Sequence, residues 1–335
     1  MNKIPEYVRE KIIVKSLASQ LVYQGKVRDT YSINDGLLLM VATDRISIFD
    51  FVLNACIPYK GEILTALTHF WLTQVLQKFP NHLVGAKKIK ERNFAVDLSL
   101  SVPDLPLGRS LVVKKMEIPP YELVFRQHLG GSAYAEYKKT GKVAGKRLPR
   151  GLRKWMYMPS MLFTPSTKEK SGHDQNIAVK KFFKRTGDTG RTSVEMFTKV
   201  YRRAYRFALS KGLVILDTKF EGGTIIADEV LTPDSSRFTS VEDLARALKE
   251  NRDPKFYDKE NVRRWGGTVY TPFKKRGEEI IGINNLDPKN PEHVEFVHRL
   301  RVPFSVIMRT SMAYQKLFEK ISGITLQEYQ RKFLF

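Results

Sequence analysis

Cysteine is almost absent from this chain, since Cys56 is the only one among 335 residues. A single cysteine excludes an intrachain disulfide and any zinc site built from several thiolates. Cys56 lies in the apolar stretch FVLNACI, which favours a small buried side chain over a reactive thiol. No uncharged run reaches the roughly 18 residues of a membrane span, and MNKIPEYVREKIIV lacks the apolar core of a signal peptide. The sequence therefore predicts a cytoplasmic protein.

Familiar catalytic signatures are mostly missing as well. The chain has no His-Glu-x-x-His pair, no Gly-x-Ser-x-Gly elbow and no Gly-x-Gly-x-x-Gly loop after a strand. The nearest approach to a P-loop, GKVAGKR at 141–147, has one residue too few between its glycines. It also carries Arg147 where Ser or Thr would hold magnesium. Zinc hydrolases and Rossmann dehydrogenases are therefore disfavoured.

Negative charge is scarce: 35 Asp and Glu face 57 Lys and Arg, which gives a net charge of +22. Such an excess favours anionic partners, namely nucleic acid, acidic membranes or phosphorylated small molecules. Aromatic residues interleave the basic run at 136–154, as in a binder of single strands. They are Tyr134, Tyr137, Trp155 and Tyr157. A basic, solvated surface is the simpler interpretation.

Predicted strands and helices alternate along the chain. With 335 residues, 42% of them apolar, the chain is long enough for one large or two moderate domains. The expected elements are strands at 36–44 and 109–118 and helices at 61–82 and 303–323. A further helix is expected to begin at the capping box Thr192/Glu195 and to end at Gly212, before the strand LVILDTKFE. This mixture predicts an α/β or α+β fold.

Short polar clusters attached to these elements are the remaining candidates for a site. YQGKVRDTY could present backbone N–H groups and two cations, Lys26 and Arg28, to a phosphate beside Gly25. VATDRISIFD puts polar side chains directly after a buried strand, where they either bind a ligand or cap the next helix. TPSTK and GHDQN form either a binding loop with Lys168 and Asp174 or an ordinary Ser/Thr turn.

Eight segments, in this order, resemble the SAICAR synthetase family of purine biosynthesis. They are GKVRD, VATDRISIFD, IPYKGEILTALTHFW, FPNHL, GRSLVVKKMEI, FTPSTKEKSGHDQNI, DTKFEGG and DEVLTPDSSRF. The resemblance implies an α+β fold of two lobes, with antiparallel sheets, flanking helices and ATP bound between the lobes. A β-rich lobe with the phosphate turn is expected at 1–117 and a larger lobe at 118–335, with an apparent insertion at 266–301.

The activity implied by the resemblance is that of a carbon–nitrogen ligase. It joins the carboxylate of 5-amino-1-(5-phosphoribosyl)imidazole-4-carboxylate to the amino group of L-aspartate, with ATP and Mg²⁺. A carboxylate is a poor acylating agent, so ATP must first convert it to an acyl phosphate. Phosphoryl transfer requires positioning and charge neutralisation rather than a protein nucleophile, which agrees with the missing catalytic motifs.

Site residues follow from the resemblance by position. ATP binding is expected at Gly25, Lys26, Arg28, Lys115 and Glu117. Substrate binding is expected at Glu122, Arg126, Ser132, Lys168, Asp174, Ser236 and Arg237. Catalytic roles are expected for Lys219, Arg126 and Asp217, and magnesium ligation for Glu221 and Asp228.

The segment DTKFEGGTIIADEV is expected to form a hairpin. Period-2 alternation puts Asp217 and Glu221 on one face, and a two-residue turn at Gly222–Gly223 would pair Glu221 with Thr224 and Asp217 with Asp228. Asp228 would then lie roughly 13 Å from Glu221, too far for one Mg²⁺ ion. Either the hairpin bends or gains a third loop residue, or Asp217 shares the magnesium work.

Departures from the family pattern leave the amine acceptor open. They include Ile48, Tyr59, Gln127 and the segment 266–301. One alternative is a related ATP-dependent ligase with another acceptor amine. Another is a nucleic-acid-binding protein, which charge and interleaved aromatics alone support. Small-molecule substrates are the favoured partners, without a membrane and with nucleic acid least favoured, and the oligomeric state stays open.

Overall fold

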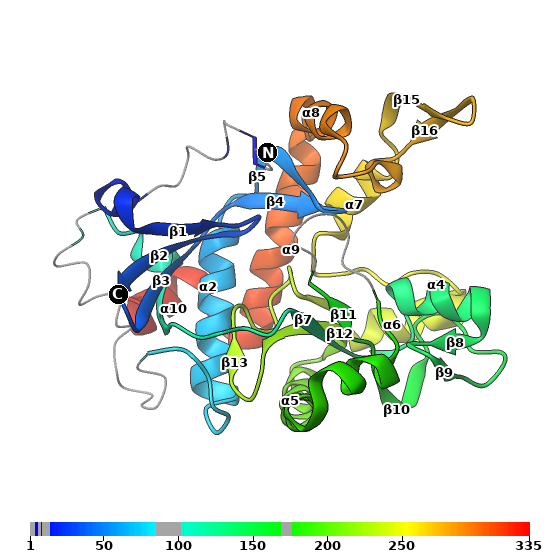
Figure 1. Ribbon diagram of the computed structural model, residues 1–335, viewed down its shortest axis with the longest axis horizontal. Helices are drawn as coiled ribbons and strands as arrows, with labels where there is room; N and C mark the ends of the chain where they lie inside the picture. Colours follow the sequence, from blue (N-terminus) through cyan, green and yellow to red (C-terminus); the bar gives the residue numbers. More distant parts are fainter. Residues whose placement is uncertain (1–3, 6–7, 9–13, 85–101, 103, 169–175) are drawn as a thin grey trace.

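The computed structural model describes residues 4–5, 8, 14–84, 102, 104–168 and 176–335 (Figure 1). Two antiparallel sheets face each other across two long helices, α2 and α9, which lie side by side in the middle of the view. This arrangement confirms the expected α+β fold. No helix in the described ranges combines the length and the apolar character needed to cross a bilayer.

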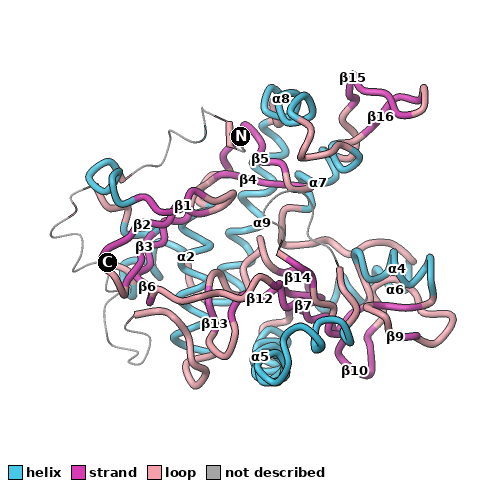
Figure 2. Tube along the Cα trace, in the orientation of Figure 1, coloured by secondary structure: helices cyan, strands magenta, loops and turns pink. Residues whose placement is uncertain are grey.

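The first sheet, in the order β1-β2-β3-β6, forms one wall of the molecule (Figure 2). Its strands are β1 (Leu21–Gln24), β2 (Arg28–Asn34), β3 (Leu37–Ala42) and β6 (Ser110–Lys114). Two 3₁₀ turns flank it, η1 (Lys15–Gln20) and η3 (Leu107–Arg109). β3 matches the strand expected at 36–44, whereas β6 ends four residues before the expected limit of 118.

The second sheet is centred on β12 (Leu213–Gly222), which pairs with β7 on one side and with β14 on the other. Its other strands are β7 (Tyr121–His128), β10 (Tyr157–Phe163), β11 (Ser166–Thr167), β13 (Ile226–Ala227) and β14 (Ser236–Ser240). Helices α4 (Gly131–Thr140), α5 (Val179–Ser210) and α6 (Val241–Glu250) and the hairpin β8 (Lys142–Val143)–β9 (Lys146–Arg147) complete this part. The first four residues of β12 are apolar, and its central position buries every residue of the strand except Lys219, which is half-buried.

Helix α5 begins well before the expected capping box. Thr192 and Glu195 lie inside the helix, and the Ser193 hydroxyl donates to the Thr189 carbonyl at 2.8 Å. The chain kinks at Gly187, whose φ of 58° lies in the left-handed region. The expected end is confirmed, since Gly212 follows the helix with a φ of 69°.

Helix α2 (Lys60–Phe70) is shorter than the helix expected at 61–82. A single π-helical turn, η2 (Trp71–Val75), follows it and ends the helical run five residues before Pro80. The Trp71 indole within this turn donates to the Leu231 carbonyl at 3.1 Å. Proline is therefore not what stops this helix.

The segment 260–335 packs in part onto the hairpin of β4 (Arg45–Ile48) and β5 (Phe51–Cys56). It contains α7 (Glu260–Gly266), β15 (Tyr270–Lys275), β16 (Glu278–Ile281), η4 (Ile283–Asn285), α8 (Pro291–Arg299), α9 (Phe304–Ser322) and α10 (Leu326–Phe333). Ile283, Leu286 and Val297 are buried in one cluster with Ile46 and Leu53 of the hairpin. The segment 266–301 thus shares a core with the N-terminal part. Helix α9 matches the helix expected at 303–323, but α10 follows it.

The largest core cluster joins side chains from both sides of residue 117. It includes Leu67 and Trp71 of the α2–η2 run, Ile215 of β12, and Tyr314 and Phe318 of α9. Buried aromatic side chains are the bulkiest members of this cluster and contribute most to hydrophobic stabilisation. The two sheets are consequently held on a common core that fixes the space between them.

Candidate active site

A cleft of about 1200 Å³ opens between the two sheets. One wall comes from β2, β3, β6 and the turn at 24–28, and the other from β7 and β12. The stretches 228–229, 233–237 and 258–264 add charged side chains. Both signs of charge are therefore concentrated in one large concave site, which is typical of an enzyme that binds anionic substrates.

The turn around Gly25 is tightly closed. The Gly25 N–H donates to the Arg28 carbonyl at 2.7 Å, and a Cβ at Gly25 would lie only 2.8 Å from that oxygen. The Arg45 guanidinium donates to the Gly25 carbonyl at 2.9 Å and is paired with buried Asp29 at 2.5 Å. Lys26 reaches the opposite hairpin, where its Nζ lies 2.7 Å from Asp50. Glycine is thus required at this position, and the buried Arg45–Asp29 pair holds the turn in place.

The segment VATDRISIFD serves both of the purposes expected of it. Asp44 accepts from the Gly61 N–H at 2.8 Å in the first turn of α2, so it caps that helix. Ser47 and Asp50 instead line the cleft. Asp50 and its neighbour Phe49 form the two-residue turn of the β4–β5 hairpin, with φ values of 68° and 51°. Such a turn normally contains Asn or Gly, so this one stores conformational strain at the cleft.

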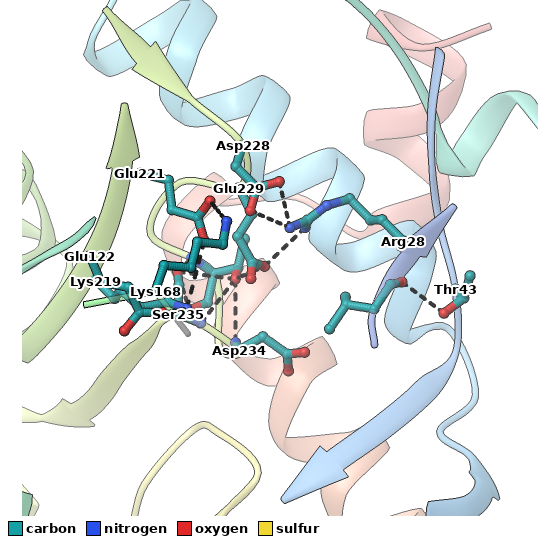
Figure 3. A network of polar contacts seen from close by, with 12 residues as sticks. Arg28, Thr43, Glu122, Lys168, Lys219, Glu221, Asp228, Glu229, Asp234 and Ser235 are labelled. Carbon is teal, nitrogen blue, oxygen red and sulfur yellow. Dashed lines mark hydrogen bonds and ion pairs between the residues drawn. The ribbon is translucent and has the colours of Figure 1, made fainter. Parts of the chain in front are cut away.

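A charged cluster fills the centre of the cleft (Figure 3). Its carboxylates are Glu122, Glu221, Asp228 and Glu229, and its cations are Arg28, Lys168 and Lys219. The Lys219 Nζ lies 2.5 Å from Glu122 and 3.8 Å from Glu221. Lys168 contacts Glu221 at 2.5 Å. The four carboxylates outnumber the three cations by one.

The electrostatics of the cluster follow from burial and from its neighbours. Burial, and then the Asp228 charge, raises the pKa of Glu221. Burial would also raise the pKa of Asp228, but Arg28, Lys168 and Lys219 outweigh it and hold that pKa below its usual range. Burial would lower the pKa of Lys219, yet Glu122 and Glu221 raise it. Lys219 therefore stays a cation, and additional positive charge beside Glu221 would stabilise its ionised form.

The hairpin that carries two of these carboxylates has a different register from the expected one. Glu221 pairs with Ala227 and Gly222 with Ile226, so three residues form the loop instead of two. The expected pairs Glu221–Thr224 and Asp217–Asp228 are therefore wrong, and the alternative with a third loop residue is confirmed. Gly222 has a φ of 129°, and a Cβ there would lie 2.2 Å from the Ile225 carbonyl. In this register Asp228 directly follows Ala227, the partner of Glu221, and it is no longer opposite Asp217.

The donor set fits a magnesium ion that also binds substrate phosphates. Among the described residues no group of three or more His, Cys, Asp or Glu side chains suits a protein-only metal site. Magnesium, however, usually takes one or two carboxylates and completes its shell with phosphate oxygens and waters. Glu221 and Asp228 are adjacent, and they belong to a cluster with an excess carboxylate.

A second cluster, near the middle of β12, combines two arginines with one carboxylate. Asp217 lies opposite Arg126 of β7 and opposite Arg237 of β14, and both guanidinium groups donate to its Oδ2. Arg126 is held further by Thr164 at 3.0 Å and donates to the Ser132 hydroxyl at 3.3 Å. The two arginines and Asp217 together have an excess of one positive charge, which suits a phosphate or carboxylate ligand.

The two glycines before Ser132 leave space for the side chains of Trp155 and Arg237. A Cβ at Gly130 would overlap the Trp155 ring at 1.8 Å, and Gly131 has a φ of 56° with the Arg237 guanidinium 2.8 Å from the Cβ position. Trp155 in turn lies beneath Arg237, whose guanidinium carbon is 6.0 Å from the ring centroid. The sequence Gly130–Gly131 therefore allows Arg237 to lie against the start of α4.

A fully buried ionic network supports the loop that leads into β14, the strand that carries Arg237. The Lys60 Nζ lies 3.0 Å from Asp234, and the Tyr314 hydroxyl donates to the other oxygen of Asp234 at 2.5 Å. Burial would raise the pKa of Asp234, but Lys259 and Lys60 lower it well below its usual range. Burial lowers the pKa of Lys259 to about 8. Helices α2 and α9 are thus both bound to the 232–235 loop.

Most of the site residues expected from the sequence meet in the cleft. Gly25, Lys26, Arg28, Glu122, Arg126, Lys168, Asp217, Lys219, Glu221, Asp228, Ser236 and Arg237 all line it. Ser132 touches Arg126 without lining the cleft. The side chains of Lys115 and Glu117 are not among the lining ones, whereas Lys114 and Met116 are, because alternate residues face opposite ways. Asp174 lies outside the described residues.

Several lining residues were not singled out from the sequence. The run DKENVRR supplies five of them: Asp258, Lys259, Glu260, Arg263 and Arg264. Burial raises the pKa of Asp258 to about 6. The feature of the sequence that indicates these residues is the close mixture of acidic and basic side chains in DKENVRR, directly before the segment at 266–301. Glu229 and Asp234 were within the recognised stretch DEVLTPDSSRF but had no role assigned.

Comparisons with known proteins agree with this geometry. The family model for SAICAR synthetase matches residues 21–280, which includes the first part of the segment expected as an insertion. A phosphoribosylaminoimidazole-succinocarboxamide synthase of Polaromonas naphthalenivorans is 40% identical over 315 residues, 90% of this chain and 94% of the relative. One of Mannheimia succiniciproducens is 40% identical over 314 residues, 91% of this chain and 99% of the relative. The structure described as SAICAR-synthase from Saccharomyces cerevisiae complexed with SAICAR superposes with a TM-score of 0.72 at 34% identity, covering 91% of this chain and 95% of that one. The chain therefore belongs to the SAICAR synthetase family of ligases.

Proposed function

We propose that this chain uses ATP to join the carboxylate of 5-amino-1-(5-phosphoribosyl)imidazole-4-carboxylate to the amino group of L-aspartate, releasing SAICAR, ADP and phosphate. One observation carries the proposal. Strand β12 bears Asp217 with its two arginines near its middle and Lys219 and Glu221 of the charged cluster toward its C-terminal end. A phosphorylated substrate and a nucleotide phosphate chain can thus be bound a few strand residues apart.

ATP binds in this proposal with its phosphates at Gly25, Lys26 and Arg28 and its base along the segment that contains Lys115 and Glu117. The closed turn at Gly25 and the Lys26–Asp50 contact support the first part. Met40, Val113 and Met116 provide an apolar lining suited to a purine ring. The charge at Arg28 is offset at present by Asp228 and Glu229.

The imidazole ribonucleotide binds by its phosphate at Arg126 and Arg237, close to Ser132 and Ser236. Paired guanidinium groups recognise phosphate oxygens bidentately, and Asp217 fixes the orientation of both arginines. Further substrate contacts are proposed for Glu122, Lys168 and Asp174. Asp217 acts through the two arginines, and it lies about four strand residues from Glu221 along β12.

Glu221 and Asp228 are the proposed magnesium ligands. When bound, the ion supplies charge neutralisation at the transferring phosphoryl group. Its positive charge would offset the excess carboxylate of the cluster and lower the raised pKa of Glu221. Lys168 and Arg28, which now contact these carboxylates, are then free to contact anionic substrate atoms.

The chemistry needs no protein nucleophile. A carboxylate oxygen of the ribonucleotide attacks the γ-phosphorus of ATP, and ADP leaves with the bonding electrons. The neutral amine of aspartate then attacks the acyl carbon, phosphate leaves, and the nitrogen loses one proton. Lys219 is the proposed cation at the transferring phosphoryl group, because Glu122 and Glu221 keep it charged and aligned in the cleft.

The arrangement of the chain is also part of the proposal. Residues 1–117 form the β-rich lobe that holds the nucleotide, and residues 118–335 form the larger lobe that holds the second substrate and the metal. ATP lies between them. Expected partners are the small-molecule substrates, and the expected compartment is the cytoplasm.

A second candidate is a ligase of the same type with a different acceptor amine. The observation that favours a different acceptor is the presence of two bulky apolar residues, Ile48 and Phe49, in the cleft lining. Ile48 fills the space left by the missing side chain of Gly266, where a Cβ would lie 2.4 Å from Ile48 Cδ1. Ile48 and Phe49 narrow the room available to an acceptor beside Asp50.

One acceptor screen tests both candidates. Purified enzyme is incubated with ATP, Mg²⁺ and the ribonucleotide, with each of the twenty amino acids and simple amines in turn, and ADP release and product mass are measured. Formation of the succinocarboxamide with L-aspartate alone supports the proposal. ADP release that depends on another amine overturns the aspartate assignment, and ADP release that needs no ribonucleotide overturns both.

A further inference from the structure

The long helix α5 has a strongly basic outer face that the ligase chemistry does not use. Nine of its residues are exposed Lys or Arg, against the two acids Asp188 and Glu195. The α5 basic face consists of Lys180, Lys181, Lys184, Arg185, Arg191, Lys199, Arg202, Arg203 and Arg206. No residue of α5 lines the cleft. This face therefore needs an explanation other than substrate binding.

The cations lie on one side of the helix. At about 100° per residue, Arg191, Lys199, Arg202, Arg203 and Arg206 fall within an arc of roughly 120°. The buried positions occupy the opposite side, as Phe197, Val200 and Ala204 belong to the main core. The second sheet thus covers the apolar side of α5, which lies at the bottom of the molecule in Figure 1, and the cations on the other side of the helix are exposed.

Few of these cations are neutralised within the protein. Lys199 pairs with Glu195 at 2.7 Å, and Arg191 lies 3.8 Å from Asp188. In the described ranges, no acidic side chain lies within ion-pair distance of the other seven. Nine cations and two acids leave an excess of seven positive charges on this one helix. The mutual repulsion favours an external polyanion.

The basic face continues beyond the helix. The Val179 N–H at the start of α5 donates to the Ala144 carbonyl in the β8–β9 turn at 3.1 Å. Lys142, Lys146 and Arg147 of that hairpin are exposed. The hairpin also explains GKVAGKR, which forms two short strands and precedes no helix, so it is not a P-loop.

We propose that the α5 basic face, extended by the β8–β9 hairpin, binds the phosphodiester backbone of duplex nucleic acid. A protein partner would require an apolar centre, and the only large apolar side chain exposed on α5 is Leu209. An anionic membrane is disfavoured for the same reason, because the apolar side of the helix is already buried in the core. A row of cations without apolar anchors matches a row of phosphates.

Contact with the backbone, not base stacking, is the mode of binding. Of the four aromatics that interleave the basic run, Trp155 is 3% and Tyr137 8% exposed, so neither can stack on an unpaired base. Tyr157 is 56% exposed, but it belongs to β10 and not to α5 or the β8–β9 hairpin. The face spans at most roughly 40 Å from Lys180 to Arg206 at 1.5 Å per residue, comparable to one turn of a duplex. The binding is independent of sequence and coexists with the ligase activity.

Two matched quadruple variants test the proposal. In the first, Lys180, Lys184, Arg202 and Arg206 of the α5 basic face are each replaced by Gln. In the second, four exposed cations elsewhere, Lys274, Lys275, Lys289 and Arg331, are replaced in the same way. Both variants lose four charges, so their net charge is equal. Binding of labelled 20-base-pair DNA and RNA duplexes is measured by fluorescence anisotropy from 50 to 200 mM salt, alongside ADP release by the ligase reaction.

The first variant is expected to bind at least about tenfold more weakly than wild type at low salt, and the second within about twofold. The slope of log K against log salt should fall by about 0.9 for each lost phosphate contact. Ligase turnover should be unchanged in both variants. Equal weakening of the two variants, or no binding at about 100 µM protein, overturns the proposal. Binding to phosphatidylserine vesicles without binding to either duplex also overturns it.

Discussion

Arg28 and Asp228 are 200 residues apart in the sequence and meet in the cleft, where the Arg28 Nη2 lies 2.7 Å from the Asp228 Oδ2. Arg28 belongs to the first sheet and Asp228 follows β13 of the second. Asp228 adopts a left-handed conformation, with a φ of 58°. The contact therefore joins the proposed phosphate turn to a proposed metal ligand.

Replacing Arg28 by Ala should lower kcat/KM for ATP by roughly 10- to 150-fold, since a hydrogen bond to a charged group contributes about 1.5–3 kcal/mol. The guanidinium contacts both Asp228 and Glu229, so Arg28→Lys should recover only part of the loss. Steady-state kinetics with varied ATP provide the measurement. A normal KM for ATP in Arg28→Ala would contradict the assignment of this turn.

Asp217 and Glu221 should fail in different ways although they share strand β12. Asp217→Asn keeps the shape but removes the charge that orients Arg126 and Arg237, so KM for the ribonucleotide should rise about tenfold or more. Glu221→Gln should leave that KM nearly unchanged and shift the Mg²⁺ concentration needed for half-maximal rate upward.

Magnesium titrations and ribonucleotide titrations of both variants separate the two roles. A shifted Mg²⁺ dependence in Asp217→Asn, together with a normal one in Glu221→Gln, would transfer the metal role to Asp217. Thermal unfolding serves as the control, because an unpaired buried arginine also destabilises the fold.

The rate should depend on pH through Lys259. Burial lowers the pKa of this side chain to about 8, so it is a cation below that pH and neutral above it. Positive charge in the cleft favours anionic substrates, and kcat/KM should therefore fall as pH rises through about 8. Lys259→Arg keeps the charge at all these pH values and should flatten this part of the profile. Parallel profiles of the two enzymes between pH 7 and about 9 would refute a role for Lys259 in this decline.

Gly266→Ala should destabilise the protein by about 1–3 kcal/mol, because the new Cβ would lie 2.4 Å from Ile48 Cδ1. Ile48→Ala alone should cost about 2–5 kcal/mol, because Ile48 is buried in the core, but it should cost less in the Gly266→Ala chain, where the new methyl group fills part of the space. Urea unfolding of the single and double variants gives the coupling free energy. Additive effects would show that the two positions do not share this space.

The sequence allowed good prediction of elements whose ends are set by local chemistry. Helix α9 ends at Gly323, which has a φ of 81°, and β3 lies within the apolar run that predicted it. The charged cluster was also largely foreseeable, since Lys219, Glu221 and Asp228 belong to recognised motifs. The ends of the helix and the strand depend on residues close together in the chain, whereas the cluster joins segments up to 200 residues apart and was foreseeable only from the family resemblance.

Predictions failed where a contact distant in sequence decided the structure. The β12–β13 register depends on the bridge between Asn81 and Ile226 and on the Ile226 N–H, which donates to the Pro80 carbonyl at 2.9 Å. No property of Gly222–Gly223 reveals these contacts. The start of α5 was missed because Gly187 kinks the helix without ending it, so the pattern at Thr192 resembled a new beginning.

The network of Lys60, Asp234 and Tyr314 has a consequence for motion in the cleft. Asp234 is separated from Arg237 by two serines, and its carboxylate is bound to α2 through Lys60 and to α9 through Tyr314. Breaking either contact would leave a charged or polar group unpaired in a dry interior. The loop therefore cannot close over a substrate by itself. Any domain closure that brings Arg237 toward a phosphate must carry both helices with it as one rigid body.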